Sequence, residues 1–334
     1  MNALTPLGGG KVAVTPLGFG SAAIAGLYSP VSPEDAAATV EAAWHAGLRY
    51  FDTAPHYGLG LAERRLGEVL RTKPRAAYTL STKVGRLLEP YTGGGDDLAH
   101  GFAVPATHRR VWDFSASGVR RALEESLTRL GTDRIDLALI HDPDGHEEQA
   151  FREAYPELER LRVEGVVGAI GAGMNQVGML ARFLTDTDVD AVLCAGRYTL
   201  LEQSALDQLL PAAQARGKSV IVGGVFNSGL LADPRSGATY DYEAAPADLL
   251  HRALRLREIA ESHGTPLRAA ALAFPFGHPA VASVLLGARS AAEVRDAAAL
   301  HAHPIPAALW DELRSTGLLP PEVPVPVQGT GGGN

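Results

Sequence analysis

The chain has 334 residues, 46% of them hydrophobic and 20% charged, which is typical of a soluble globular protein with a large core. A formal net charge of −8 argues against nucleic acid as a partner, because a nucleic-acid-binding face is expected to be basic. No apolar run is long enough to span a membrane, residues 1–10 lack the pattern of a signal peptide, and the single Cys194 cannot form an internal disulfide. We therefore expect a cytoplasmic protein without a membrane partner.

Short apolar segments alternate with helical patterns along the whole chain. Strands are predicted at residues 14–20, 49–53, 76–83, 134–142, 166–173, 190–198, 218–224 and 280–288. Helices are predicted at residues 32–47, 62–72, 115–131, 147–165, 176–187 and 201–217, then within 247–277, with a last major helix at 291–301. The first helix carries the clearest boundary signals, with a capping Ser32, Pro33 at its first position and Gly47 after its end.

Eight apolar strands that alternate with helices predict an α/β fold, a closed (β/α)8 TIM barrel. An open doubly wound sheet is the alternative, but no GxGxxG motif opens the first helix, so the phosphate loop of that fold is missing. We expect one domain over residues 1–320, with a long loop insert after the third strand and extra C-terminal helices. The Pro- and Gly-rich residues 321–334 are expected to form a mobile tail.

Polar side chains end three successive predicted strands. Asp52, Lys83 and His141 each follow an apolar run, and Tyr57 lies in the loop five residues after Asp52. In a barrel these positions meet at the C-terminal face, where barrel enzymes carry their chemistry. A lysine ammonium beside a tyrosine is expected to lower the pKa of the phenol, an aspartate can hold the lysine, and a histidine can polarise a carbonyl. The set can move one proton at an alcohol or carbonyl oxygen, and a nicotinamide would have to carry the hydride.

The same residues also allow other interpretations. Asp52 and Lys83 could form a structural ion pair inside the barrel. A non-catalytic barrel that binds a cofactor, or an isomerase or lyase without a nicotinamide, belongs to a different functional class on the same fold. The eleven histidines show no metal-binding spacing, so no metal site is predicted.

Six motifs in order give a more specific indication: LGFGSAAIAGLY, DTAPHYG, STKVGR, IDLALIHDPD, IGAGMN and LLGARS. Together they resemble the aldo-keto reductase superfamily over about residues 11–300. Two further segments, residues 101–115 and 196–203, resemble its branch of D-threo-aldose 1-dehydrogenases (L-fucose dehydrogenases) and pyridoxal 4-dehydrogenases. The resemblance implies a catalytic tetrad of Asp52, Tyr57, Lys83 and His141, with Tyr57 as the proton carrier. It also implies an NAD(P)-dependent reaction that oxidises the C1 hydroxyl of an aldose, of the L-fucose, D-arabinose or L-galactose type, to an aldonolactone.

The resemblance also places a nicotinamide cofactor against the strand ends. The implied cofactor-binding residues are Gly20, Ser21, Asn175, Gly223, Phe226, Gly287, Arg289 and Glu293. Several of them depart from the family pattern. Met174 replaces the serine that usually precedes Asn175, Ala195 stands where a glutamine is usual, and Gly223 stands where an aromatic ring often stacks, with Phe226 nearby as a substitute.

The choice between NAD and NADP depends on the last predicted strand and helix. Gly287 and Glu293 occupy positions where NADP-dependent relatives carry lysine and arginine, and a carboxylate would repel a 2′-phosphate. Arg289 could still bind a phosphate, but we expect NAD to be favoured.

The substrate is expected to be a small sugar or aldehyde, held by His56, Trp112 and Asp142. For His56 and Asp142 a solvent-facing loop position is the alternative. Trp112 could form a wall of the pocket or anchor the insert to the barrel rim, whereas His108, Arg109 and Arg110 are expected to be solvated. A pyridoxal 4-dehydrogenase and a general aldehyde or ketone reductase remain open, as does the oligomeric state.

Overall fold

Eight parallel strands close into a barrel in the computed structural model, which describes residues 4–241 and 243–327. The barrel strands are β3 (Leu17–Gly20), β4 (Tyr50–Asp52), β5 (Thr79–Val84), β10 (Ile135–His141), β11 (Val167–Met174), β12 (Ala191–Ala195), β13 (Ser219–Gly223) and β16 (Val281–Gly287). Each strand pairs with its neighbours in the chain, and β16 pairs with β3 to complete the ring. The predicted (β/α)8 barrel is confirmed.

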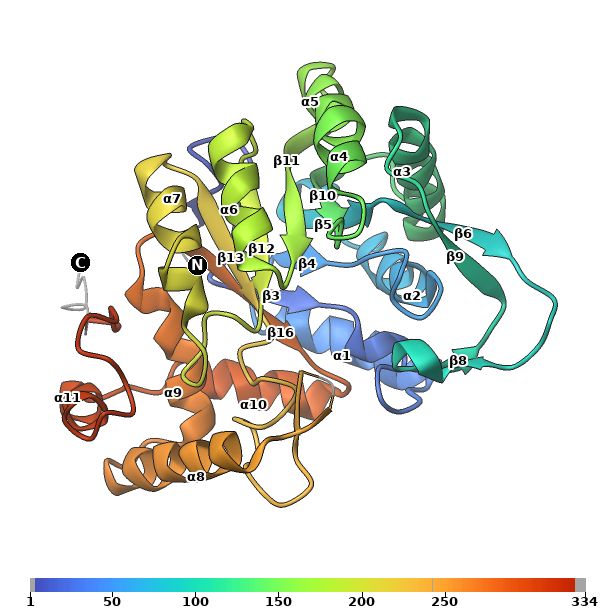
Figure 1. Cartoon of the computed structure of the whole chain (residues 1–334). Helices are drawn as coiled ribbons and strands as arrows, with labels where there is room; N and C mark the ends of the chain where they lie inside the picture. The colour runs from blue at the N-terminus through green and yellow to red at the C-terminus, as the bar shows by residue number, and fades with distance from the viewer. Residues whose placement is uncertain (1–3, 242, 328–334) are drawn as a thin grey trace.

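Helices surround the strands on the outside (Figure 1). They are α1 (Pro33–His45), α2 (Leu61–Leu70), α3 (Ala116–Leu130), α4 (Glu147–Gln149), α5 (Tyr155–Val163), α6 (Val177–Asp186), α7 (Leu209–Ala215), α8 (Ala247–Ser262), α9 (Leu267–Ala273), α10 (Ala291–His301) and α11 (Ala307–Ser315). The predicted cap at Ser32 is present, since it accepts a hydrogen bond from a backbone N–H group in the first turn of α1, and Ser115 caps α3 in the same way. Among the described residues, no helix has both the length and the apolar character needed to cross a membrane.

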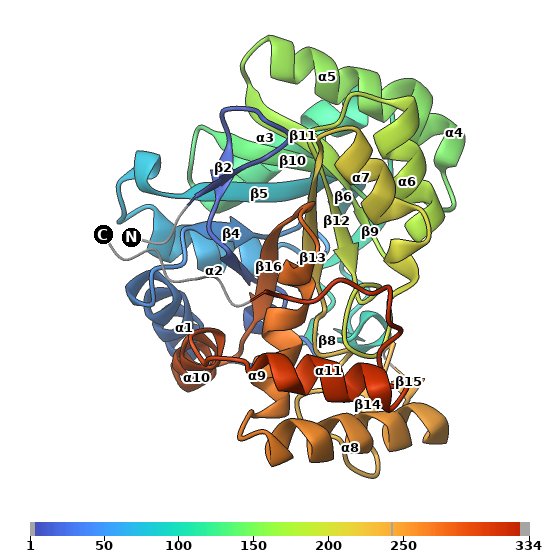
Figure 2. The same ribbon diagram turned by 90° about the vertical axis from the view of Figure 1, so that its left-hand side faces the viewer.

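Two predicted helices differ in detail from the structure, and one helix of the structure was not predicted. The segment 147–165 is interrupted by a π-helical turn at Ala150–Ala154, just before Pro156, whose ring cannot donate a backbone hydrogen bond. The segment 201–217 contains only the short α7, preceded by a 3₁₀ turn at Ser204–Leu206. Contrary to prediction, α10 is not the last substantial helix, because α11 follows it and packs against α8 (Figure 2).

The insert after β5 is more ordered than the predicted loop. It forms two small antiparallel sheets, one from β6 (Arg86–Pro90) and β9 (His108–Trp112), the other from β7 (Asp96–Asp97) and β8 (Phe102–Pro105). Gly85 turns the chain out of the barrel at φ 102°, and a Cβ atom there would lie 2.1 Å from the Phe114 ring. In Figure 1 the insert extends sideways from the barrel and then folds back, and a bridge between Leu27 and Phe102 ties it to the segment after β3.

Strand periodicity decides which side chains enter the barrel. Leu137 and Leu139 of β10 pack in the apolar interior, so His141, two residues further, lies on the same inward face. The same spacing relates buried Tyr50 to Asp52 on β4. Leu7 and Val14 from the N-terminal hairpin, β1 (Thr5–Pro6) and β2 (Ala13–Val14), join this interior cluster. Apolar residues therefore fill the lower barrel, while the upper inward positions carry polar groups.

The predicted tail, residues 321–334, lies partly outside the described residues. In its described part, Val323 is buried and its carbonyl accepts a hydrogen bond from Arg314 of α11. Whether the rest of the tail is mobile stays a prediction.

Candidate active site

A buried ion pair lies at the upper end of the barrel interior. Lys83 Nζ donates to Asp52 Oδ2 at 2.6 Å and to the Thr53 carbonyl at 3.0 Å, and both charged side chains are almost fully buried. Ser81 Oγ donates to the other carboxylate oxygen at 2.7 Å. Burial opposes the charge on Lys83, but the Asp52 carboxylate and the Tyr57 hydroxyl outweigh it and raise the pKa of Lys83 above its ordinary value. The ammonium is therefore held in place and stays charged.

Tyr57 lies directly above this pair, with Lys83 Nζ 4.7 Å from the centroid of its ring. Tyr57 is half-buried, and burial raises its pKa to about 12, although Lys83 acts to lower it. Lys83 thus lowers the pKa of Tyr57 as expected, but the desolvation that the sequence did not predict outweighs it. The phenol holds its proton at neutral pH and can donate it to a developing alkoxide.

His141 completes the group, its ring centroid 5.9 Å from that of Tyr57. Burial, with Arg86 and Lys83 nearby, holds the pKa of His141 well below 6.5, so the imidazole is neutral. Its Nε2 lies 3.4 Å from Asp142 Oδ2, and its buried Nδ1 has no hydrogen-bond partner within the described chain. A neutral imidazole can position and polarise a substrate oxygen without competing for the proton of Tyr57.

His56, the residue before Tyr57, is drawn into the site by the insert. Arg110 of β9 donates to His56 Nδ1 at 2.6 Å, and the His56 ring lies 5.8 Å from that of His141 between centroids. Arg110 is therefore not solvated as expected. The alternation of side chains along β9 points it inward, whereas its neighbour Arg109 is exposed.

Arg86 is a second buried cation that the sequence did not single out. It follows Gly85, forms an ion pair with Asp142, and stacks its guanidinium 4.3 Å from the centroid of the Trp112 ring. Trp112 also contacts Phe114, yet 44% of its surface remains exposed. The tryptophan thus anchors the insert and still presents an open face.

A cavity of about 440 Å³ opens between this group and the insert. Most of the residues that line it have polar or charged side chains, and they are His56, Arg86, Tyr91, Asp96, Asp97, Ala99, His100, Ala106, His108, Arg109, Arg110 and Trp112. The cavity meets the tetrad at His56, whose ring lies 6.0 Å from that of Tyr57 between centroids. None of Asp52, Tyr57, Lys83 and His141 lines the cavity, so a small molecule in it would lie next to the tetrad through His56.

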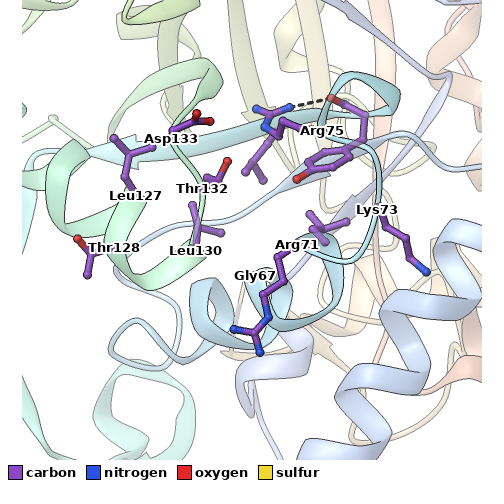
Figure 3. Close-up of a pocket in the computed structure, with 13 residues that line it drawn as sticks. Gly67, Arg71, Lys73, Arg75, Leu127, Thr128, Leu130, Thr132 and Asp133 are labelled. Carbon is purple, nitrogen blue, oxygen red and sulfur yellow. Dashed lines mark hydrogen bonds between the residues drawn. The ribbon is translucent and has the colours of Figure 1, made fainter.

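A larger cavity of about 540 Å³ lies away from these residues (Figure 3). It is lined by the C-terminal ends of α2 and α3 and by the segments that enter β5 and β10, at the opposite end of the barrel. In this cavity Arg75 donates to the carbonyl of Tyr78. None of the predicted site residues contributes to this cavity.

The positions implied for the cofactor lie at the upper ends of β16, β3, β11 and β13. Gly20 and Gly287 are partners across β3 and β16, and a Cβ atom at Gly287 would meet no other atom within 4 Å. The buried Ser21 Oγ has no hydrogen-bond partner in the described chain, which suits a polar ligand group. Asn175 follows β11 and is half-buried, as is Phe226, three residues after Gly223 at the end of β13. This open edge fits a nicotinamide cofactor.

Arg289 and Glu293 meet at the start of α10. Glu293 accepts from the Arg289 backbone N–H at 2.8 Å and from its guanidinium at 3.3 Å. Ser290 caps the same helix end by accepting from the Glu293 N–H. The arginine charge that could hold a phosphate is thus partly neutralised by the carboxylate.

A model of the aldo/keto reductase family matches residues 16–317. A D-threo-aldose 1-dehydrogenase from a Pseudomonas species is 45% identical over 315 residues, covering 92% of this chain and 96% of that protein. A pyridoxal 4-dehydrogenase from Microbacterium luteolum is 41% identical over 318 residues, covering 90% and 93%. The solved structure of an aldo-keto reductase from Bacillus halodurans matches with a TM-score of 0.75 at 25% identity, covering 98% of this chain and 99% of that one. The chain belongs to the aldo/keto reductase family, whose members are oxidoreductases that use NAD(P)H.

The buried histidines predict how the protein responds to acid. Burial, together with the charges of Arg86 and Arg110, lowers the pKa of His56 to about 2 in the folded protein. In the unfolded chain a histidine has a pKa of about 6.5, so as the pH falls the unfolded chain takes up this proton before the folded protein does. The stabilising contribution is complete above pH of about 6.5 and is lost progressively as the pH falls below it. As the pH is lowered, the free energy of unfolding should decrease in both proteins. We expect the decrease to be smaller in His56→Gln than in the unmodified protein, by about 1.4 kcal/mol per pH unit. Urea unfolding from pH 6.5 towards 4.5 measures this, and equal slopes would contradict the assigned environment of His56.

Proposed function

We propose that this protein is a nicotinamide-dependent dehydrogenase that oxidises the C1 hydroxyl of an aldose to an aldonolactone. The observation that carries the proposal is the cavity of about 440 Å³ that is lined by His56, the neighbour of Tyr57, and by charged residues of the insert. Its histidines, paired arginines and carboxylates offer donors and acceptors to a molecule with several hydroxyl groups, and Trp112 offers a flat face to the C–H groups of a sugar ring. The 45% identical D-threo-aldose 1-dehydrogenase supports an aldose of the L-fucose, D-arabinose or L-galactose type.

In this proposal the four inner residues share the handling of one proton. Tyr57, as phenolate, takes the proton of the C1 hydroxyl, and in the reverse direction the phenol returns it. Lys83 stabilises the phenolate, Asp52 holds Lys83 at 2.6 Å, and neutral His141 orients the reacting oxygen. The nicotinamide, when bound, supplies the site that accepts the C1 hydride. Asp142 and His56 would contact the remaining hydroxyls.

The proposed cofactor residues are Gly20, Ser21, Asn175, Gly223, Phe226, Gly287, Arg289 and Glu293. NAD is the proposed partner, because the guanidinium of Arg289 already pairs with Glu293 at 3.3 Å and the carboxylate would repel a 2′-phosphate. A 2′-hydroxyl could instead donate to Glu293.

This cofactor choice predicts the effect of one substitution. Glu293→Gln should raise the ratio of kcat/KM for NADP over NAD about tenfold, because it removes the repulsion and releases Arg289 to bind the phosphate. Glu258→Gln on α8 is the matched control, since Glu258 forms a similar exposed pair with Arg255 and should leave the ratio unchanged. An unchanged ratio in Glu293→Gln would remove this carboxylate from the cofactor site.

A pyridoxal 4-dehydrogenase is the second candidate, favoured by the 41% identical relative of that name. The Trp112 face and the donors of the cavity could equally receive a hydroxymethylated pyridine ring. A general aldehyde or ketone reductase uses the same four inner residues.

Formation of reduced nicotinamide tests these possibilities directly. The protein is supplied with NAD or NADP and with L-fucose, D-arabinose, L-galactose or pyridoxal. Turnover of the sugars supports the proposal, whereas turnover of pyridoxal alone moves the substrate and keeps the mechanism. If the protein binds the cofactor, oxidises none of the four substrates and reduces simple aldehydes with NADH, the proposed dehydrogenase function is replaced by that of a general reductase. Failure to bind either nucleotide would favour an isomerase or lyase, and binding without any turnover would favour a non-catalytic barrel.

A further inference from the structure

Three segments that are distant in the chain meet at one imidazole. His56 lies in the loop after β4, Asp97 belongs to β7, and Arg110 belongs to β9. The Arg110 side chain is only 9% exposed and that of Asp97 only 5% exposed. A cation buried to this degree on a surface insert has an energetic cost, so its contacts require an explanation.

The guanidinium of Arg110 connects His56 to the insert. Its Nε donates to His56 Nδ1 at 2.6 Å, and its Nη2 donates to the His56 carbonyl at 2.8 Å. Both terminal nitrogens also donate to the two oxygens of Asp97 at 2.6 Å. The planar fork of an arginine can make all four bonds at once, which a lysine cannot. Ring and backbone of His56 are therefore held together.

These bonds determine the protonation of the imidazole. Arg110 can only donate, so His56 Nδ1 must accept, and the single proton of the neutral ring lies on Nε2. The His56 ring lines the cavity and also lies near the tetrad. Its centroid is 5.8 Å from the ring centroid of His141 and 5.5 Å from that of Phe102. His56 Nε2 makes no hydrogen bond to any described residue, so this N–H is available to a ligand.

We propose that Arg110 is a positioning residue that holds His56 in the Nε2–H form, so that His56 donates to a hydroxyl or ring oxygen of the bound substrate. His56 then recognises an oxygen acceptor next to the reacting carbon, and Arg110 acts only through it. This inference rests on the proposed function for the identity of the substrate, but not for the state of the imidazole.

The surrounding charges keep this state constant over the working pH range. The positive charges near His56 are those of Arg86 and Arg110 in the insert and of Lys83 in the barrel. The ring centroid of His100 lies 6.1 Å from that of His56, and the Asp97 carboxylate forms an ion pair with Arg110. Burial and these cations lower the pKa of His56 to about 2. Without Arg110, Nδ1 is free to take a proton and the two neutral forms can exchange.

Nitrogen-15 spectra of the histidine side chains test the first half of the proposal. The His56 signals, assigned by their loss in His56→Phe, should show the Nε2–H form and no titration between pH of about 5 and 8. In Arg110→Met the same signals should titrate or show mixed protonation. An Nδ1–H form, or a titrating His56 in the unmodified protein, would overturn the proposal without any further variant.

Steady-state kinetics with the best aldose test the second half. Arg110→Met should raise KM about tenfold and change kcat much less, since one substrate hydrogen bond loses its orientation. In the His56→Phe background the same substitution should add less than about twofold, because its effect passes through His56. Equal factors in the two backgrounds would show that Arg110 acts by another route. Arg121→Met, which breaks an exposed pair with Glu125 on α3, is the matched control and should change neither constant.

Arg110→Lys separates charge from geometry. The lysine keeps the positive charge but cannot make the four hydrogen bonds. A KM that stays raised in Arg110→Lys supports the positioning role. A KM equal to that of the unmodified protein would assign only an electrostatic role to Arg110. If the unmodified protein oxidises neither aldoses nor pyridoxal, the proposed function fails, and the spectra still decide the assignment of Arg110 and His56.

Discussion

Replacing Tyr57 by Phe is expected to lower kcat for oxidation of the preferred substrate about a thousandfold, while cofactor affinity stays within about twofold. The phenol is the acidic group placed next to Lys83, whose Nζ lies 4.7 Å from the ring centroid. Neutral His141 and the charged Lys83 cannot replace it, because their pKa values are shifted away from neutrality in opposite directions. The measurement is initial-rate kinetics combined with a titration of cofactor binding.

The direction of the Tyr57 shift adds a pH dependence. Because burial raises its pKa to about 12, the phenol form dominates at neutral pH and the phenolate fraction grows about tenfold per pH unit. Oxidation should therefore accelerate as the pH rises, whereas carbonyl reduction, which needs the phenol, should not. Tyr78→Phe, at the opposite end of the barrel, is the control and should keep full activity. Near-normal turnover in Tyr57→Phe would exclude this residue as the proton carrier.

Replacing Lys83 by Met should destabilise the protein by about 3–5 kcal/mol and abolish turnover. Asp52 and Lys83 are only 3% and 1% exposed, so loss of the ammonium leaves a buried carboxylate without its partner. Ser81 alone, which donates to Asp52 at 2.7 Å, cannot compensate for a full charge. Denaturant unfolding and initial rates on the folded protein provide the two measurements.

The double variant Asp52→Asn with Lys83→Met distinguishes a functional pair from a structural one. Removing both charges should restore most of the lost stability, because no unpaired charge remains, but activity should stay lost. Glu63→Gln serves as a comparison, since Glu63 forms a buried pair with Arg129 and should cost stability without changing kcat. Recovery of activity together with stability in the double variant would mean that Asp52 and Lys83 serve only the fold.

The architecture and the inner residues of the site follow from local patterns. Apolar runs, the helix caps at Ser32 and Ser115, and the eight alternating units predict the barrel, which the closed ring of strands confirms. Strand periodicity then places Asp52, Lys83 and His141 at the upper inward positions. These features depend on residues close in the chain, so sequence alone is sufficient for them.

The outer part of the site depends on contacts between distant residues. Arg110 and Arg86 resemble ordinary surface cations in the sequence, and only the folded insert pairs them with His56, Asp97 and Asp142. The order of the insert itself was also missed, because its short strands carry no strong periodic signal and pair across long stretches of chain, as in the pairing of Arg86 with Trp112.

The sequence by itself determined the barrel, its strand ends and the chemical type of the four inner residues, because these follow from short-range periodicity. Only the tertiary structure decided the net pKa shift of Tyr57 and the orientation of His56. The first is a balance between desolvation and neighbouring charge, and the second depends on the guanidinium of Arg110. Both exist only once the chain has brought these groups together.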